Sequence, residues 1–228
     1  MKSLNWSRYR PVLPAAVLLI VPSTWAAQHT GGAPAIVTQS CSGCHGVDGN
    51  SQLPYIPRLA GQNAAYVERK LASFRAAAAP PVDEGPGRVG RAGSASAGAG
   101  ITNAATVNMV GIARSLSGED EKAAAQWYAS RTPAPGTSGK PKLIEEGRSL
   151  FAKGVDSQGL LACQACHGAE AQGSALAPRL AGQHASYVVS QLALYRAPGR
   201  QHSPEMAAVA QHLERGQAQA VAAYLESR

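Results

Sequence analysis

The pattern C-x-x-C-H occurs twice in the chain, at residues 41–45 and again at residues 163–167. This spacing is the attachment signature of a c-type haem: two thiols form thioethers to the porphyrin, and the adjacent histidine reaches the iron. The two copies use every cysteine of the chain. We therefore expect two covalently bound haem c groups, attached through Cys41, Cys44, Cys163 and Cys166, with His45 and His167 as iron ligands.

Two other uses of these cysteines fit the pattern less well. A structural zinc site needs four nearby nitrogen or sulfur ligands, and one copy offers only two thiols and a histidine. A disulfide or a thioredoxin-like redox pair is compatible with an exported chain. Neither use explains why a histidine directly follows both cysteine pairs.

The N-terminus has the three parts of a secretory signal peptide. Basic residues precede an apolar run at 12–21, and small residues follow it, with cleavage expected after Ala26 or Ala27. The apolar run is shorter than the roughly 20 residues of a membrane-spanning helix, although an uncleaved anchor stays open. We therefore assign residues 1–26 to the signal peptide and expect the mature protein in the periplasm.

The charge of the chain argues against a nucleic-acid partner. The formal net charge is +7, and it falls to +4 without Lys2, Arg8 and Arg10 of the signal peptide. No long run of lysine or arginine occurs, so nothing indicates a nucleic-acid surface. The charge is compatible with a peripheral association with the membrane surface.

An internal repeat predicts two copies of one domain. The sequence P-R-L-A-G-Q at 57–62 returns at 178–183 with an offset of 121, whereas the offset from Met109 to Met206 is 97. The first copy therefore holds 24 extra residues, in a low-complexity insert at about 76–103 that is typical of a mobile surface loop. We expect a first domain at 27–131, a linker at 132–141 and a second domain at 142–228.

Hydrophobic periodicity predicts helices and no strands. The expected helices are at 143–151, 185–196, 119–130 and 217–227, with Trp127 and Tyr224 packed inward.

Two methionines remain for two haems once the signal peptide is removed. Met109 and Met206 occupy matched positions of the repeat, so we expect each to bind one iron opposite the histidine, although a lone methionine can also fill a core gap. Bis-histidine ligation is the alternative. The repeat does not support it, because the additional histidines have no matched partners; we interpret those of the second domain as surface residues, and they are His184, His202 and His212.

Other residues of the repeat are candidates for the surroundings of the haem. The carbonyls of Pro57 and Pro178 are suitably spaced to accept a hydrogen bond from the second ring nitrogen of each histidine. Polar side chains that follow them are candidates to bind haem propionates, with ordinary surface packing as the alternative: Arg58, Gln62, Tyr66, Arg179, Gln183 and Tyr187.

Taken together, these motifs resemble the cytochrome c₄ family of dihaem c-type cytochromes. The resemblance covers nearly all of the mature chain and is most specific in the combination of C-x-x-C-H with P-R-L-A-G-Q. It implies an all-α fold of two tandem class I cytochrome c domains related by a pseudo-twofold axis. It also implies electron transfer in a respiratory chain, from a quinol-oxidising complex toward a terminal oxidase. The first domain lacks the G-x-x-L-F pattern of the second, so its opening helix is expected to be short.

Three functions are compatible with this reading. An electron carrier in which both irons are six-coordinate is favoured over an enzyme, because a six-coordinate iron has no vacancy for substrate. The second function is a dihaem cytochrome subunit of a periplasmic dehydrogenase. The third is a dihaem peroxidase, against which the matched methionines argue.

Overall fold

The structure, a computed structural model, describes residues 32–77, 104–196 and 203–228, and of residues 104–107 only the backbone. The expected signal peptide, most of the insert, and His202 lie outside the described residues. Within them, regular structure is helical apart from one isolated β-bridge between Val155 and Leu160, which confirms the predicted all-α class. The elements are η2 (Val37–Cys41), α1 (Ser42–His45), α2 (Ala64–Ala76), α3 (Ala104–Ser115), α4 (Gly118–Ala129), α5 (Pro141–Lys153), η3 (Asp156–Gln158), α6 (Gln164–His167), α7 (Ala185–Arg196), α8 (Pro204–Gln211) and α9 (Arg215–Glu226).

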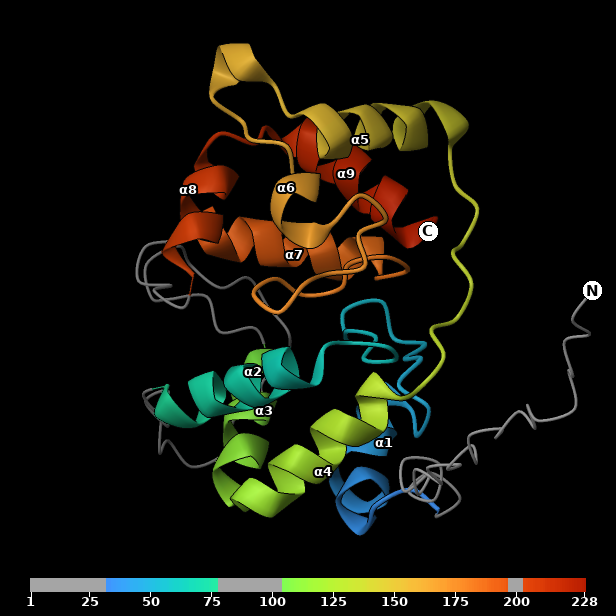
Figure 1. The fold of residues 1–228 in the computed structure, drawn as a ribbon, viewed down its shortest axis with the longest axis vertical. Coiled ribbons are helices and arrows are strands. Elements are labelled where there is room, and N and C mark those ends of the chain that lie inside the picture. The colour runs from blue at the N-terminus through green and yellow to red at the C-terminus, as the bar shows by residue number, and fades with distance from the viewer. Residues whose placement is uncertain (1–31, 78–103, 197–202) are drawn as a thin grey trace, which may run out of the picture. The chain divides into compact units, whose positions relative to one another are not determined.

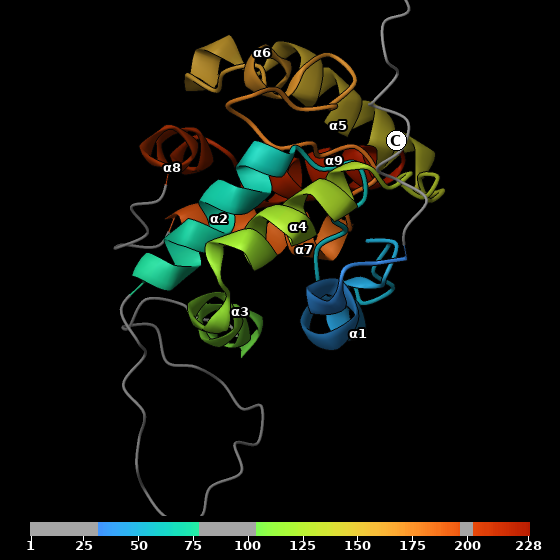
Figure 2. The ribbon, with the colours of Figure 1, turned by 60° about the horizontal axis from the view of Figure 1, so that its bottom comes forward.

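The first group of helices contains α2, α3 and α4, and α2 packs against both of the others. Figures 1 and 2 both show α2 beside α4. Their shared core consists of Val67, Leu71, Ala113 and Ala125, with Met109 packed against it. The opening helix is short, as expected, and contains the π-helical turn η2 that ends at Cys41.

The second group is built on the contact between α5 and α9, which lie side by side in Figure 1. The two backbones approach closely at Gly147, where an added Cβ would overlap the carbonyl oxygen of Ala220. Only glycine permits this approach, which lets Phe151 pack against Tyr224 with ring centroids 5.4 Å apart. Tyr224 therefore points inward as predicted. Trp127 of the first group is partly buried and packs against a core of Val37, Ala124 and Tyr128, which also agrees with the prediction.

The final helices of the two groups begin in the same way. Ser117 caps α4 in a capping box with Asp120, and Glu214 caps α9 in a capping box with Gln217. The two N-caps are 97 residues apart, which is the offset that aligns the methionines. The final helix therefore begins at the equivalent position in both copies of the repeat.

The connection between the two groups is extended and anchored at both ends. Asn50 accepts a hydrogen bond from the Ala134 amide (2.7 Å) and donates one to the Thr132 carbonyl (3.1 Å). Farther along, the Thr137 amide donates to the carbonyl of Glu226 (2.9 Å). The proposed linker at 132–141 thus contacts residues from both groups, while the domain limits at 131 and 142 stay predictions. Among the described helices, none is long and apolar enough to cross a membrane.

Candidate haem-attachment sites

Each C-x-x-C-H motif lies on a single helical turn. Cys41 ends η2 and precedes α1, and Cys163 is the N-cap of α6, so each pair of thiols is three residues apart on one side of a turn. The first thiol of each pair is partly buried and the second is exposed. Burial raises the pKa of the Cys41 thiol, with a further rise from Asp120, and raises that of Cys163 to about 11.

The histidines that follow are buried and fixed by matching hydrogen bonds. Nδ1 of His45 lies 2.9 Å from the carbonyl oxygen of Pro57, and Nδ1 of His167 lies 2.9 Å from that of Pro178. A carbonyl oxygen only accepts, so Nδ1 carries the proton and the lone pair remains on Nε2. Burial lowers the pKa of both imidazoles, partly opposed by these hydrogen bonds, which favours the neutral form that binds a metal. The predicted contacts with both prolines are therefore present.

The two methionines lie on equivalent helices. Met109 is on α3 and Met206 is on α8, and both side chains are partly buried. Four residues after each comes a fully buried alanine, Ala113 or Ala210. Residues i and i+4 share a face of a helix, so both methionines lie on the face that is turned to the interior. Their ligation of iron stays a prediction.

The two P-R-L-A-G-Q segments bind to each other. Oε1 of Gln62 accepts from the Arg179 amide (2.8 Å), and its Nε2 donates to the Arg179 carbonyl (3.0 Å). Gln183 makes the same two contacts with Arg58, at 2.9 and 3.0 Å. When residue i contacts j' and its equivalent i' contacts j, the interface is isologous. These contacts supply a residue-level basis for the predicted pseudo-twofold axis.

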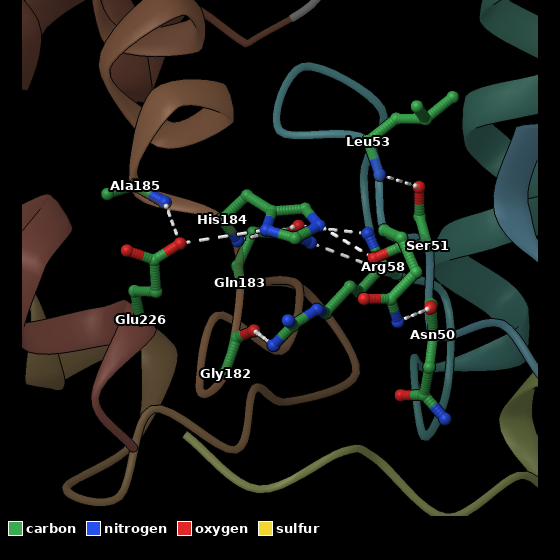
Figure 3. A network of polar contacts seen from close by, with 10 residues as sticks. Asn50, Ser51, Leu53, Arg58, Gly182, Gln183, His184, Ala185 and Glu226 are labelled. Carbon is green, nitrogen blue, oxygen red and sulfur yellow. Dashed lines mark hydrogen bonds and ion pairs between the residues drawn. The ribbon is translucent and has the colours of Figure 1, made fainter. Parts of the chain in front are cut away.

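The interpretation of His184 as a surface residue is wrong. Its side chain is buried at this interface, with Nε2 2.8 Å from the carbonyl oxygen of Ser51 and Nδ1 3.6 Å from a carboxylate oxygen of Glu226 (Figure 3). On the other side of the interface, Asn63 donates to the carbonyl of Ser174 (3.2 Å). The repeat alignment showed which residues are equivalent but not which surfaces meet. His212 is exposed, as predicted.

The residues expected near the propionates divide into two groups. Gln62 and Gln183 are used by the interface. Arg58 donates from its NH1 group to the Gly182 carbonyl (2.7 Å), but its Nε atom, like that of Arg179, is buried and has no hydrogen-bond partner within the described residues. Burial also lowers the pKa of Arg179. A propionate carboxylate would satisfy such a donor, so these arginines fit the expected haem groups.

Tyr66 and Tyr187 lie partly buried on α2 and α7. Their role toward a propionate stays a prediction.

The four cysteines are unpaired. In the part of the chain that the structure describes, no group of three His, Cys, Asp or Glu side chains is arranged to hold a metal ion.

Comparison with known proteins agrees with this geometry. The family model for cytochrome c matches residues 32–111 and 144–228. The chain is 31% identical to a cytochrome c4 of Azotobacter vinelandii, over 82% of the chain and 83% of that protein. It is 30% identical to a thiosulfate dehydrogenase electron acceptor of Stutzerimonas stutzeri, over 98% of the chain and 95% of that protein.

A solved structure shows the same fold. The crystal structure of reduced recombinant cytochrome c4 from Pseudomonas stutzeri matches with a TM-score of 0.68 and 31% identity, covering 83% of this chain and 94% of the other.

Proposed function

The chain belongs to the cytochrome c4 family of dihaem electron carriers, and from this premise we propose that it is a periplasmic shuttle with histidine–methionine ligation at both irons. It carries two covalently bound haem c groups, one at each C-x-x-C-H motif. Each haem, when bound, takes up and releases one electron at its iron. The chain's own residues supply both protein ligands of each iron and keep the two attachment sites in place.

The chain holds each iron with a neutral histidine and a methionine. The observation that carries the proposal is the matched arrangement: both His45 and His167 donate Nδ1–H to a proline carbonyl, and Met109 and Met206 lie on equivalent helices. A fixed Nδ1–H orients the ring and increases the basicity of Nε2. Methionine raises the reduction potential relative to a second histidine, and it occupies the position that a substrate would need.

The polar residues between the domains support a second role. Arg58 and Arg179 each keep a buried Nε–H donor, and we propose that these bind haem propionates. The paired glutamines hold the two domains in one orientation, so the attachment sites keep a constant separation. A constant separation supports electron passage between two sites, because tunnelling depends steeply on distance.

The expected partners are a quinol-oxidising complex as donor and a terminal oxidase as acceptor, with export by the signal peptide at 1–26. A second candidate has one specific observation in its favour. A relative that spans almost the whole chain is named as a thiosulfate dehydrogenase electron acceptor, which favours the alternative of a dihaem cytochrome subunit of a periplasmic dehydrogenase. Both candidates are electron-transfer functions and differ in the donor.

Purification of the native protein under gentle conditions separates the two candidates. A free shuttle elutes alone and is reduced by a quinol-oxidising complex, but not by thiosulfate with thiosulfate dehydrogenase. A dehydrogenase subunit in constant ratio contradicts the shuttle. For the closed irons, we expect that the reduced protein binds no carbon monoxide and that the protein lacks peroxidase turnover. Carbon monoxide binding at either haem contradicts the proposed ligation.

A further inference from the structure

An ion pair in the first domain joins three helices at one point. A guanidinium nitrogen of Arg75, near the end of α2, pairs with the carboxylate of Glu121 on α4. Nε of the same arginine donates to the carbonyl of Ala113 on α3 (3.4 Å). The Glu121 side chain is only 11% exposed, whereas that of Arg75 is 43% exposed. The buried carboxylate therefore depends on this arginine for its compensation.

A second arginine reinforces the same junction. Arg114, on α3, donates to the carbonyl of Ala77 (2.6 Å), directly after α2 ends. Both contacts therefore tie the end of α2 to α3. α3 is the helix that carries Met109, which lies four residues before Ala113.

The second domain has no acid at the position equivalent to Glu121. The matched N-caps fix the register of α4 and α9, and in that register Glu121 corresponds to Ala218, which is also buried. Arg196 is the counterpart of Arg75, so the arginine is present in both copies and the acid in only one.

The two domains also differ in the length of chain between these helices. α2 ends at Ala76 and α3 begins at Ala104, whereas α7 ends at Arg196 and α8 begins at Pro204. A longer connection restricts the relative position of its two ends less. The ion pair thus occurs in the domain where the chain itself restricts the methionine-bearing helix least.

We propose that the Arg75–Glu121 pair is a positioning device that holds α3, and with it Met109, against α2 and α4 in place of the short connection of the second domain. The pair acts through the helix, not by contact with the iron. This inference rests on the proposed function, because it takes Met109 as an iron ligand.

Competition with added imidazole tests the positioning. Imidazole displaces methionine from oxidised iron and removes the near-infrared methionine–iron band, so its apparent affinity reports how well the methionine is held. In the holoprotein, Glu121→Ala, which introduces the second-domain residue, is expected to bind imidazole at one haem about tenfold more tightly. The part of the band that comes from the other haem should disappear at the same imidazole concentrations as in the wild type. Glu121→Gln keeps the side-chain size and should show the same direction.

Two matched controls separate positioning from general stability. Arg196→Gln replaces the counterpart of Arg75 in the second domain, where Ala218 stands in place of the acid. Glu145→Gln breaks the exposed pair with Arg148. Neither should change the imidazole titration. If Glu121→Ala and Glu121→Gln lower the denaturant midpoint but leave both imidazole affinities at the wild-type values, the pair is merely structural and the inference is overturned.

Met109→Ala distinguishes this inference from the proposed function. If Met109→Ala retains the whole band, Met109 is no ligand and both proposals fail. If Met109→Ala loses half of the band while Glu121→Ala titrates as the wild type, only the positioning role is contradicted.

Discussion

Replacing Gln62 by alanine removes half of the pairing between the two repeat segments. The Gln62 side chain is buried and bonds both the amide (2.8 Å) and the carbonyl (3.0 Å) of Arg179. A buried polar group left without a partner costs about 1–3 kcal/mol. Two such groups, with partial access of water, predict a loss of about 2–4 kcal/mol in the free energy of unfolding.

Guanidinium unfolding of the holoprotein, followed by far-UV circular dichroism and by haem absorbance, measures this loss. Gln52→Ala is a matched control, because Gln52 is exposed and its Nε2 donates to the nearby Asn50 carbonyl (3.0 Å). The control should stay within about 0.5 kcal/mol of the wild type. The interface argument is refuted if Gln62→Ala is no more destabilised than Gln52→Ala.

Three further predictions concern packing, pH and the buried histidine. Gly147→Ala places a Cβ against α9 and should cost about 1–3 kcal/mol by calorimetry, whereas Gly118→Ala, with open space around it, should not. Hydrogen bonds from Ser117 lower the pKa of Asp120, so the contribution of this carboxylate to the free energy of unfolding is complete above its unfolded pKa and is lost as the pH falls through its folded pKa. The difference in unfolding free energy between the wild type and Asp120→Asn should therefore shrink in acid. A difference that stays constant with pH would contradict this. His184→Ala leaves the Ser51 carbonyl unpaired and should lower the free energy of unfolding by about 1–3 kcal/mol. The near-infrared methionine–iron band should not change.

Local patterns predicted the features that depend on local chemistry. The predicted helix at 185–196 has the bounds of α7, although the two residues that α7 buries, Val188 and Leu194, do not lie on one apolar stripe. The predicted start of α9 at residue 217 is two residues late, because Glu214 is the N-cap and the helix begins at Arg215. Glutamate is a weaker capping signal than the serine of α4.

Features that depend on the meeting of two surfaces were missed. The repeat contains an arginine and a glutamine at the same positions in both copies, and we interpreted them as residues near the haem. Their pairing across a pseudo-twofold axis could have been suspected, because a duplicated polar motif can satisfy its own hydrogen bonds. His184 had no such signal, since its counterpart is Asn63 and no short-range pattern marks it as buried.

The near-infrared spectrum of the oxidised protein tests the central claim, that both irons are closed by methionine. The account predicts the methionine–iron band in the wild type, the loss of about half of it in Met109→Ala and in Met206→Ala, and its absence in the double variant. A wild-type band that either single variant leaves undiminished, or one that a single variant removes completely, would contradict one methionine at each haem.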